Sequence, residues 1–130
     1  MHLYPVSIGI TFVTIRIIKE DSQGNLWVGT ANGLNQLDVQ SGRFTRYKHI
    51  ANDPYSLSHN HIYSIIEDSQ NILWIGTHNE GLSRFNPNKG KFKNYQFEYN
   101  NQQSLSDDSI IVMTADRQQN LWVGTGGGLN

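Results

Sequence analysis

The chain has 130 residues, with 10 lysines and arginines, 11 aspartates and glutamates and a net charge of −1 at pH 7. This length suits one modest domain or a piece of a larger one, and the charge balance provides no positive field for a phosphate backbone, so we expect no nucleic-acid partner. The absence of cysteine excludes a disulfide scaffold, a cysteine nucleophile and a thiolate metal site. No run of about 20 apolar residues predicts a membrane span, so we expect no direct membrane contact.

An apolar stretch at 3–18 comes first along the chain. It contains Pro5 and Arg16, has no basic residue ahead of its core and shows no small-residue cleavage pattern. It is therefore a poor match to a signal peptide, and its second half is better explained as a strand of the first repeat.

Three tryptophans mark an internal repeat, because Trp27, Trp74 and Trp122 are 47 and 48 residues apart. The segments 20–30, 67–77 and 115–125 are nearly the same text, and a Gly-Leu pair follows each of them. A Phe-x-x-Tyr segment and a Ser-Leu-Ser segment recur in the linking sequence. A period of this length is typical of repeat architectures.

Each repeat predicts four short strands and no helix. The first is rich in β-branched residues, at 15–19, 62–67 and 110–114, and the second is the Leu-Trp-Val/Ile-Gly-Thr segment. The third alternates apolar and polar residues at 34–38 and 82–86, and the fourth is expected at 44–47 and 92–95. No window shows an apolar period of 3.6 residues.

Four antiparallel strands in each repeat predict an all-β fold of β-propeller blades. We expect two full blades and part of a third within one partial propeller at 1–130, with repeats at about 15–47, 62–95 and 110–130. Propellers have about four to eight blades, so the sequence predicts a fragment of a larger propeller.

Residues that are the same in every repeat are interpreted as structural. The tryptophan is expected to pack between blades rather than stack on sugar rings. The glycine of Gly-Thr suits close backbone approach by a neighbour, and the aspartate is expected to open the first hairpin rather than form a calcium loop, which needs more oxygen ligands. These residues are Trp27, Trp74, Trp122, Gly29, Gly76, Gly124, Asp21, Asp68 and Asp116.

Residues that differ between repeats are freer to carry function. In a propeller, the loop before the first strand and the turn after the second open on the same face, and in the second repeat the loop carries two histidines and the turn carries a third. We expect a polar ligand rim there, with zinc as the less favoured reading of three histidines and a glutamate. The rim residues are His59, Asn60, His61, His78, Asn79, Glu80, Asp107 and Asp108. No cofactor motif, nucleophile motif or phosphate loop accompanies them.

The combined motif resembles the two-component regulator propeller repeat. The resemblance covers Asp21 to Leu34, Asp68 to Leu82 and Asp116 to Leu129, together with the Phe44/Tyr47 and Phe92/Tyr95 strands. It departs from the repeat where Gly24 becomes Asn71 and Gln119, and where Glu80 adds a residue.

The resemblance implies a periplasmic, non-enzymatic ligand sensor of a hybrid histidine kinase, often for oligosaccharides. The alternative is a propeller that serves as a protein-interaction scaffold. A lyase or glycosidase would need paired carboxylates in the channel, and the regularity of the blades argues against that. Open blade faces also predict self-association.

Overall fold

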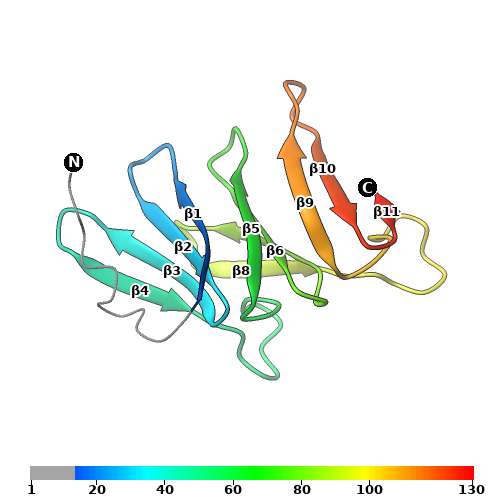
Figure 1. Ribbon diagram of the computed structural model, residues 1–130, viewed down its shortest axis with the longest axis horizontal. Helices are drawn as coiled ribbons and strands as arrows, with labels where there is room; N and C mark the ends of the chain where they lie inside the picture. The colour runs from blue at the N-terminus through cyan, green and yellow to red at the C-terminus, as the bar shows by residue number, and fades with distance from the viewer. Residues whose placement is uncertain (1–13) are drawn as a thin grey trace.

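The computed structural model describes residues 14–130, so most of the apolar stretch at 3–18 lies outside the described residues. Its strands form three separate antiparallel sheets arranged side by side (Figure 1). The first sheet has the order β1-β2-β3-β4, the second β5-β6-β7-β8 and the third β11-β10-β9. The described residues contain no helix, and the predicted all-β fold with four-stranded antiparallel sheets is confirmed.

The strands have the following bounds. The first sheet contains β1 (Ile15–Glu20), β2 (Leu26–Thr30), β3 (Gly33–Asp38) and β4 (Arg43–Tyr47). The second contains β5 (Ile62–Glu67), β6 (Leu73–Thr77), β7 (Leu82–Asn86) and β8 (Lys91–Tyr95). The third contains β9 (Ile110–Ala115), β10 (Leu121–Thr125) and β11 (Gly128–Leu129).

The two ends of the sheets are different surfaces. The β1–β2, β5–β6 and β9–β10 hairpins project together toward the upper edge of Figure 1, and we call this side the hairpin end. The opposite side carries the turns after β2, β6 and β10 and the loops that lead into β5 and β9, and we call it the loop end. The first strands of neighbouring sheets, β1, β5 and β9, contact one another in series.

An aspartate closes each hairpin at the hairpin end. Oδ1 of Asp21 accepts hydrogen bonds from the amides of Gln23 and Asn25, both at 2.9 Å, and Oδ2 accepts one from Trp27 Nε1 at 2.8 Å. Asp68 and Asp116 bind Trp74 and Trp122 in the same way, at 3.0 and 2.9 Å. One carboxylate therefore fixes both the turn and the tryptophan.

The turns keep a left-handed residue even where the glycine is lost. Gly24, Asn71 and Gln119 occupy the same turn position with φ of 85°, 63° and 70°. Asparagine tolerates this conformation better than glutamine, so the third hairpin is the most strained of the three.

Neighbouring sheets interlock through isoleucine and glycine. A Cβ placed on Gly29 would lie 2.6 Å from Cγ2 of Ile62, and one on Gly76 would lie 2.6 Å from Cγ2 of Ile110. A side chain of the same sheet, Ile17 or Ser64, lies equally close at 2.6 Å, so side chains approach these two glycines, and not the backbone that the sequence led us to expect. At Gly124 the nearest described atom is Cγ1 of Val112, at 2.8 Å, which belongs to the same sheet.

Candidate functional site

The loop end of the second sheet is built by two segments that pair with each other. The turn after β6 carries one residue more than its counterparts, and Asn79 takes up a left-handed φ of 60° within it. The amide of His78 donates to the carbonyl of His61 at 3.0 Å, which ties this turn to the loop that leads into β5. Two segments 17 residues apart therefore meet at one point of the surface.

Three imidazoles gather where these segments meet, and we call His59, His61 and His78 the imidazole cluster. The ring centroids of His61 and His78 are 5.4 Å apart, and those of His59 and His78 are 6.4 Å apart. Asn79 Nδ2 lies 2.9 Å from His78 Nε2, so a neighbouring residue of the turn fixes the orientation of this ring.

β-Bulges in the first strand of each sheet add residues to this surface. The register shifts between Ile15 and Ile17 in β1, between Ile62 and Ser64 in β5, and opposite the Gly124–Thr125 step in β9. The residues left without a cross-strand partner are Arg16, Tyr63 and Ile111. Bulges redirect side chains and are frequent beside functional sites.

Two of the bulge residues join the imidazole cluster. The hydroxyl of Tyr63 is 2.9 Å from His78 Nδ1, and its ring centroid is 5.0 Å from that of His61. The guanidinium of Arg16 lies over the Tyr63 ring at 5.9 Å from its centroid. The first and second sheets therefore share one group of aromatic and basic side chains.

The environment of His61 disfavours its charged form. Burial lowers the pKa of His61 from its ordinary value of 6.5, and the nearby Arg16, His78 and His59 lower it further. Its Nε2 atom is buried and has no hydrogen-bond partner among the described residues. The His61 ring is therefore neutral near pH 7 and retains an unused polar atom.

The remaining rim residues do not join the cluster. Asn60 Oδ1 accepts from the amide of His49 at 2.7 Å, and Asp108 Oδ1 accepts from the amide of Phe97, at the equivalent position of the next linker. Asp107 Oδ1 accepts from the amide of Ser109 at 2.7 Å. These three side chains shape the linkers between the sheets.

The Glu80 carboxylate is engaged by a residue outside the cluster. Its Oε2 accepts from Gln96 Nε2 at 3.2 Å. The zinc set of three histidines and Glu80 is therefore not assembled. Within residues 14–130, no group of three or more histidine, cysteine, aspartate or glutamate side chains has a geometry that could hold a metal ion.

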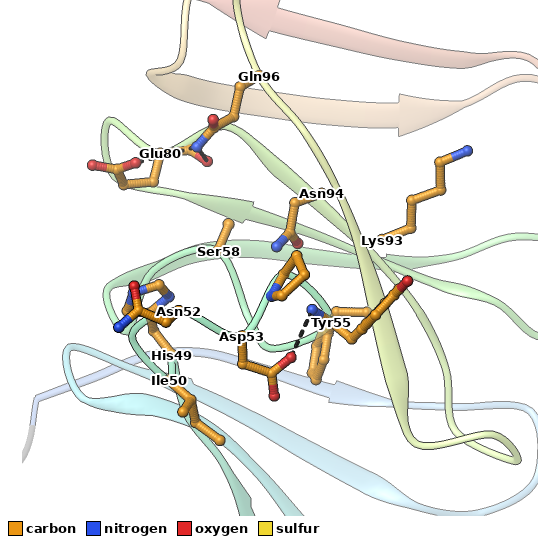
Figure 2. Close-up of a pocket in the computed structure, with 12 residues that line it drawn as sticks. His49, Ile50, Asn52, Asp53, Tyr55, Ser58, Glu80, Lys93, Asn94 and Gln96 are labelled. Atoms are coloured by element: carbon orange, nitrogen blue, oxygen red, sulfur yellow. Dashed lines mark hydrogen bonds between the residues drawn. The ribbon is translucent and has the colours of Figure 1, made fainter.

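Glu80 lines a separate cleft, which we call the linker cleft because the linker between β4 and β5 forms one wall (Figure 2). β8 and the residues after it form the other wall, and the volume is about 680 Å³. Its lining mixes amides, charges and an exposed aromatic ring: His49, Ile50, Asn52, Asp53, Pro54, Tyr55, Ser58, Glu80, Phe92, Lys93, Asn94 and Gln96. The linker cleft and the imidazole cluster share the loop 58–61 and the turn 77–81.

Sequence reasoning missed several of these residues. Arg16 and Tyr63 were assigned only to strands. Residues 16, 63 and 111 occupy the same position in the three repeats and are a different amino acid in each, and that variation was a usable signal. Tyr55, Lys93 and Asn94 lie in a linker and an outer strand, and no motif marks the cleft that they form together. In the part of the chain described by the structure, no helix is long and apolar enough to cross a membrane.

Comparison with known proteins places this geometry in a family. The family model described as "Two component regulator propeller" matches residues 9–32, 56–79 and 104–127. Histidine kinase P4 of Formosa agariphila is 38% identical over an alignment of 73 residues, and the match covers 50% of this chain and 5% of that protein.

Solved structures of extracellular domains of two-component systems are similar to this chain over more of its length. The extracellular domain of the hybrid two-component system BT3049 from B. thetaiotaomicron superimposes with a TM-score of 0.77 and 28% identity, covering 90% of this chain and 18% of that one. The extracellular domain of BT4673 from the same organism superimposes with a TM-score of 0.66 and 32% identity, covering 90% of this chain and 15% of that one.

The chain thus spans less than a fifth of the length of each of these relatives. The family model covers more than half of the chain, and its three matches lie at the same place in each repeat, from the sequence just before the first strand to the turn after the second. The chain belongs to the two component regulator propeller family.

Proposed function

We propose that this chain is part of the extracytoplasmic, ligand-sensing propeller of a two-component regulator, in the periplasm. The observation that carries the proposal is its similarity, over 90% of its length, to an extracellular domain of a hybrid two-component system. Its role is binding and not catalysis: a ligand that prefers one state of the receptor shifts the receptor toward that state by its differential affinity.

The ligand proposed is an oligosaccharide bound at the loop end of the second sheet. Small-ligand sites are concave and hold about 300–1,000 Å³, a range that includes the linker cleft. Asn94, Lys93 and Gln96 provide donors and acceptors for sugar hydroxyls, and the exposed ring of Tyr55 provides an apolar face. Of the rim residues predicted from the sequence, Glu80 lines this cleft, and His59, Asn60, His61, His78 and Asn79 lie on the two segments that border it.

Binding to a panel of neutral and acidic oligosaccharides tests this function. Saturation-transfer NMR on the purified chain should detect at least one member, and Tyr55→Ala should weaken its binding by about tenfold, since one stacked ring contributes roughly 1–1.5 kcal/mol. Tyr99→Ala is the matched control, because Tyr99 is exposed and does not line the cleft. An equal loss in both variants, or no binding by the folded chain, would contradict the proposal.

A second role, protein association, is favoured by the third sheet. Its exposed apolar side chains are Ile111, Val112, Trp122 and Leu129. At Gly29 the space above the glycine is filled by Ile62 of the next sheet, and at Gly124 no described side chain of another sheet fills the equivalent space. Ile15 is the counterpart of Ile62 in the first sheet, and it is exposed. We propose that Ile15 of a second copy seats at Gly124, in a head-to-tail contact.

The mass in solution tests this association. Light scattering after size exclusion should give a discrete oligomer, and Ile15→Asp should convert it to a monomer. Ile18→Asp is the control, because Ile18 is exposed in the same strand and is not the counterpart of Ile62. A monomeric parent chain at high concentration would contradict it.

A further inference from the structure

The bulge residues Arg16 and Tyr63 bring a fixed cation to the imidazole cluster. Arg16 belongs to the first sheet and Tyr63 to the second, and the guanidinium lies 5.9 Å from the centroid of the ring. The same ring is 5.0 Å from His61 and 5.3 Å from His78, measured between centroids. One guanidinium and two imidazoles therefore surround a single phenol.

The charged groups that act on His61 are all basic. Apart from burial, the influences that lower the pKa of His61 come from Arg16, His78 and His59, and no carboxylate contributes. The acidic rim residues predicted from the sequence are hydrogen-bonded elsewhere: Glu80 to Gln96, Asp107 to the amide of Ser109 and Asp108 to the amide of Phe97. Among the described residues, none of these three carboxylates hydrogen-bonds to Arg16 or to the histidines.

The hydrogen bonds of the cluster leave donors for a ligand. His78 uses both ring nitrogens, one toward Tyr63 and one toward Asn79, so its ring is held in place. Arg16 is exposed at its bulge, and a guanidinium binds a carboxylate through two parallel N–H donors. Arg16 is therefore the group that contacts an anion, and the histidines set its surroundings.

We propose that Arg16, beside the imidazole cluster, binds the carboxylate of a uronate residue in an acidic oligosaccharide. The inference rests on the proposed saccharide-binding function and names its ligand class. Tyr63 presents a partly exposed ring beside Arg16 for the pyranose, and a bound carboxylate pairs with the positive charge of Arg16.

Matched trisaccharides test the ligand class. Calorimetry compares trimers of galacturonate, glucuronate and mannuronate with the neutral trimers of galactose, glucose and mannose. We expect at least one uronate trimer to bind about tenfold or more tighter than its neutral counterpart, because a paired charge adds at least 1.4 kcal/mol. Raising the salt concentration should remove most of that preference.

Substitutions and NMR place the anion. Arg16→Gln should abolish the preference for uronate, while Arg43→Gln, an exposed arginine on the outer strand β4, should leave it unchanged. The measured pKa of His61 should rise on binding a uronate trimer and stay constant with a neutral one, which a purely structural role of His61 would not produce.

The outcomes separate this inference from the proposed function. Neutral trimers that bind as tightly as uronates would overturn the acidic ligand class and leave saccharide sensing standing. Failure of all six trimers to bind the folded chain would overturn the inference, and failure of the whole oligosaccharide panel would overturn the proposed function as well. If inorganic sulfate alone raises the pKa of His61 and no uronate does so, the site binds a free anion and the saccharide assignment is wrong.

Discussion

The two interfaces between sheets use the same repeat but bury it to different extents. Trp27, at the first interface, has 0% exposure. It lies in a group of four rings with Tyr47, Phe85 and Phe92. The ring centroid of Trp27 is 5.7 Å from that of Phe85, and Phe85 stacks on Phe92 at 4.3 Å. At the second interface Trp74 is only partly buried and its ring neighbour is Tyr95 of its own sheet, at 5.9 Å. Trp122, on the third sheet, is 44% exposed.

The difference shows what buries the repeated tryptophan. Phe85 lies in β7 and Phe92 in β8, so these rings come from the third and fourth strands of the following sheet. Among the described residues the third sheet has only the two-residue β11 in that region, and a groove of about 910 Å³ lies between Trp74, Tyr95, Leu105, Leu121 and Leu129. A blade therefore completes the core of the blade before it, as expected for a repeat stabilised by its neighbours.

Removing a ring from the first interface has the largest expected effect. Phe85→Ala should destabilise the chain by about 3–5 kcal/mol, since Phe85 is fully buried against Trp27 and Tyr47. It should also shift the tryptophan emission to longer wavelength. Urea unfolding measures the loss, and Phe97→Ala, at an exposed phenylalanine of a linker, should change the midpoint little. Equal midpoints for the two variants would mean that the four-ring group does not hold the sheets together.

Replacing the strand glycines by alanine should have the next largest effect, and the loss of stability should differ between the first and third sheets. Gly29→Ala places a methyl group 2.6 Å from both Ile17 and Ile62, in a buried site, and should cost about 1–3 kcal/mol. Gly124→Ala meets Val112, which is exposed and free to shift, so its cost should be smaller. Thermal unfolding of the two variants in parallel tests the order, and the reverse order would contradict the interlocking described above.

The hairpin aspartates provide a smaller contrast. Asp21→Asn removes the charge from a buried group that accepts four hydrogen bonds and should destabilise the chain by about 1–2 kcal/mol. Asp116→Asn changes an equivalent set of bonds in exposed surroundings and should cost less. Urea midpoints decide between them, and indistinguishable midpoints would show that burial of the turn does not matter.

The loss of stability in acid depends on the same two carboxylates, Asp21 and Asp116, and is the smallest effect expected. Hydrogen bonds from Trp122 and Asn120 lower the pKa of Asp116 from 3.8 to about 2, and for Asp21 the bonds from Trp27, Asn25 and Gln23 outweigh the burial that raises its pKa. Both carboxylates bind fewer protons in the folded state, so their stabilisation is present above the unfolded pKa of 3.8 and is lost as the pH falls through the lowered folded pKa, which is about 2 for Asp116. Stability measured across this range should fall less in the Asp21→Asn/Asp116→Asn double variant than in the parent chain.

The fold was predictable because its signals are local and repeated. Alternating strands, the Asp-to-Trp hairpin and the Gly-Leu turn each occur three times, so every copy supports the others. The differences between interfaces were not predictable from the repeat, since the burial of Trp27 depends on Phe85 and Phe92, which lie 58 and 65 residues later.

The candidate site was only partly predictable, for a related reason. The pairing of strands brings His61 next to His78, and the topology alone predicts that contact. The bulges in β1 and β5 that redirect Arg16 and Tyr63 each shift the register by one residue, and the amino-acid composition of these strands does not predict them. The amide bonds that occupy Asn60 and Asp108 depend on the path of the linkers, which the sequence does not specify.

These comparisons converge on one claim: residues that repeat build the blades, and residues that differ at the loop end bind the ligand. Amide NMR spectra of the chain, recorded with and without the six-trisaccharide mixture, test it most directly. The account predicts shifted amides at 58–63 and 77–81 and at Arg16, with unchanged amides in the three aspartate turns at the hairpin end. Shifts centred on those turns, or no shifts at all, would contradict it.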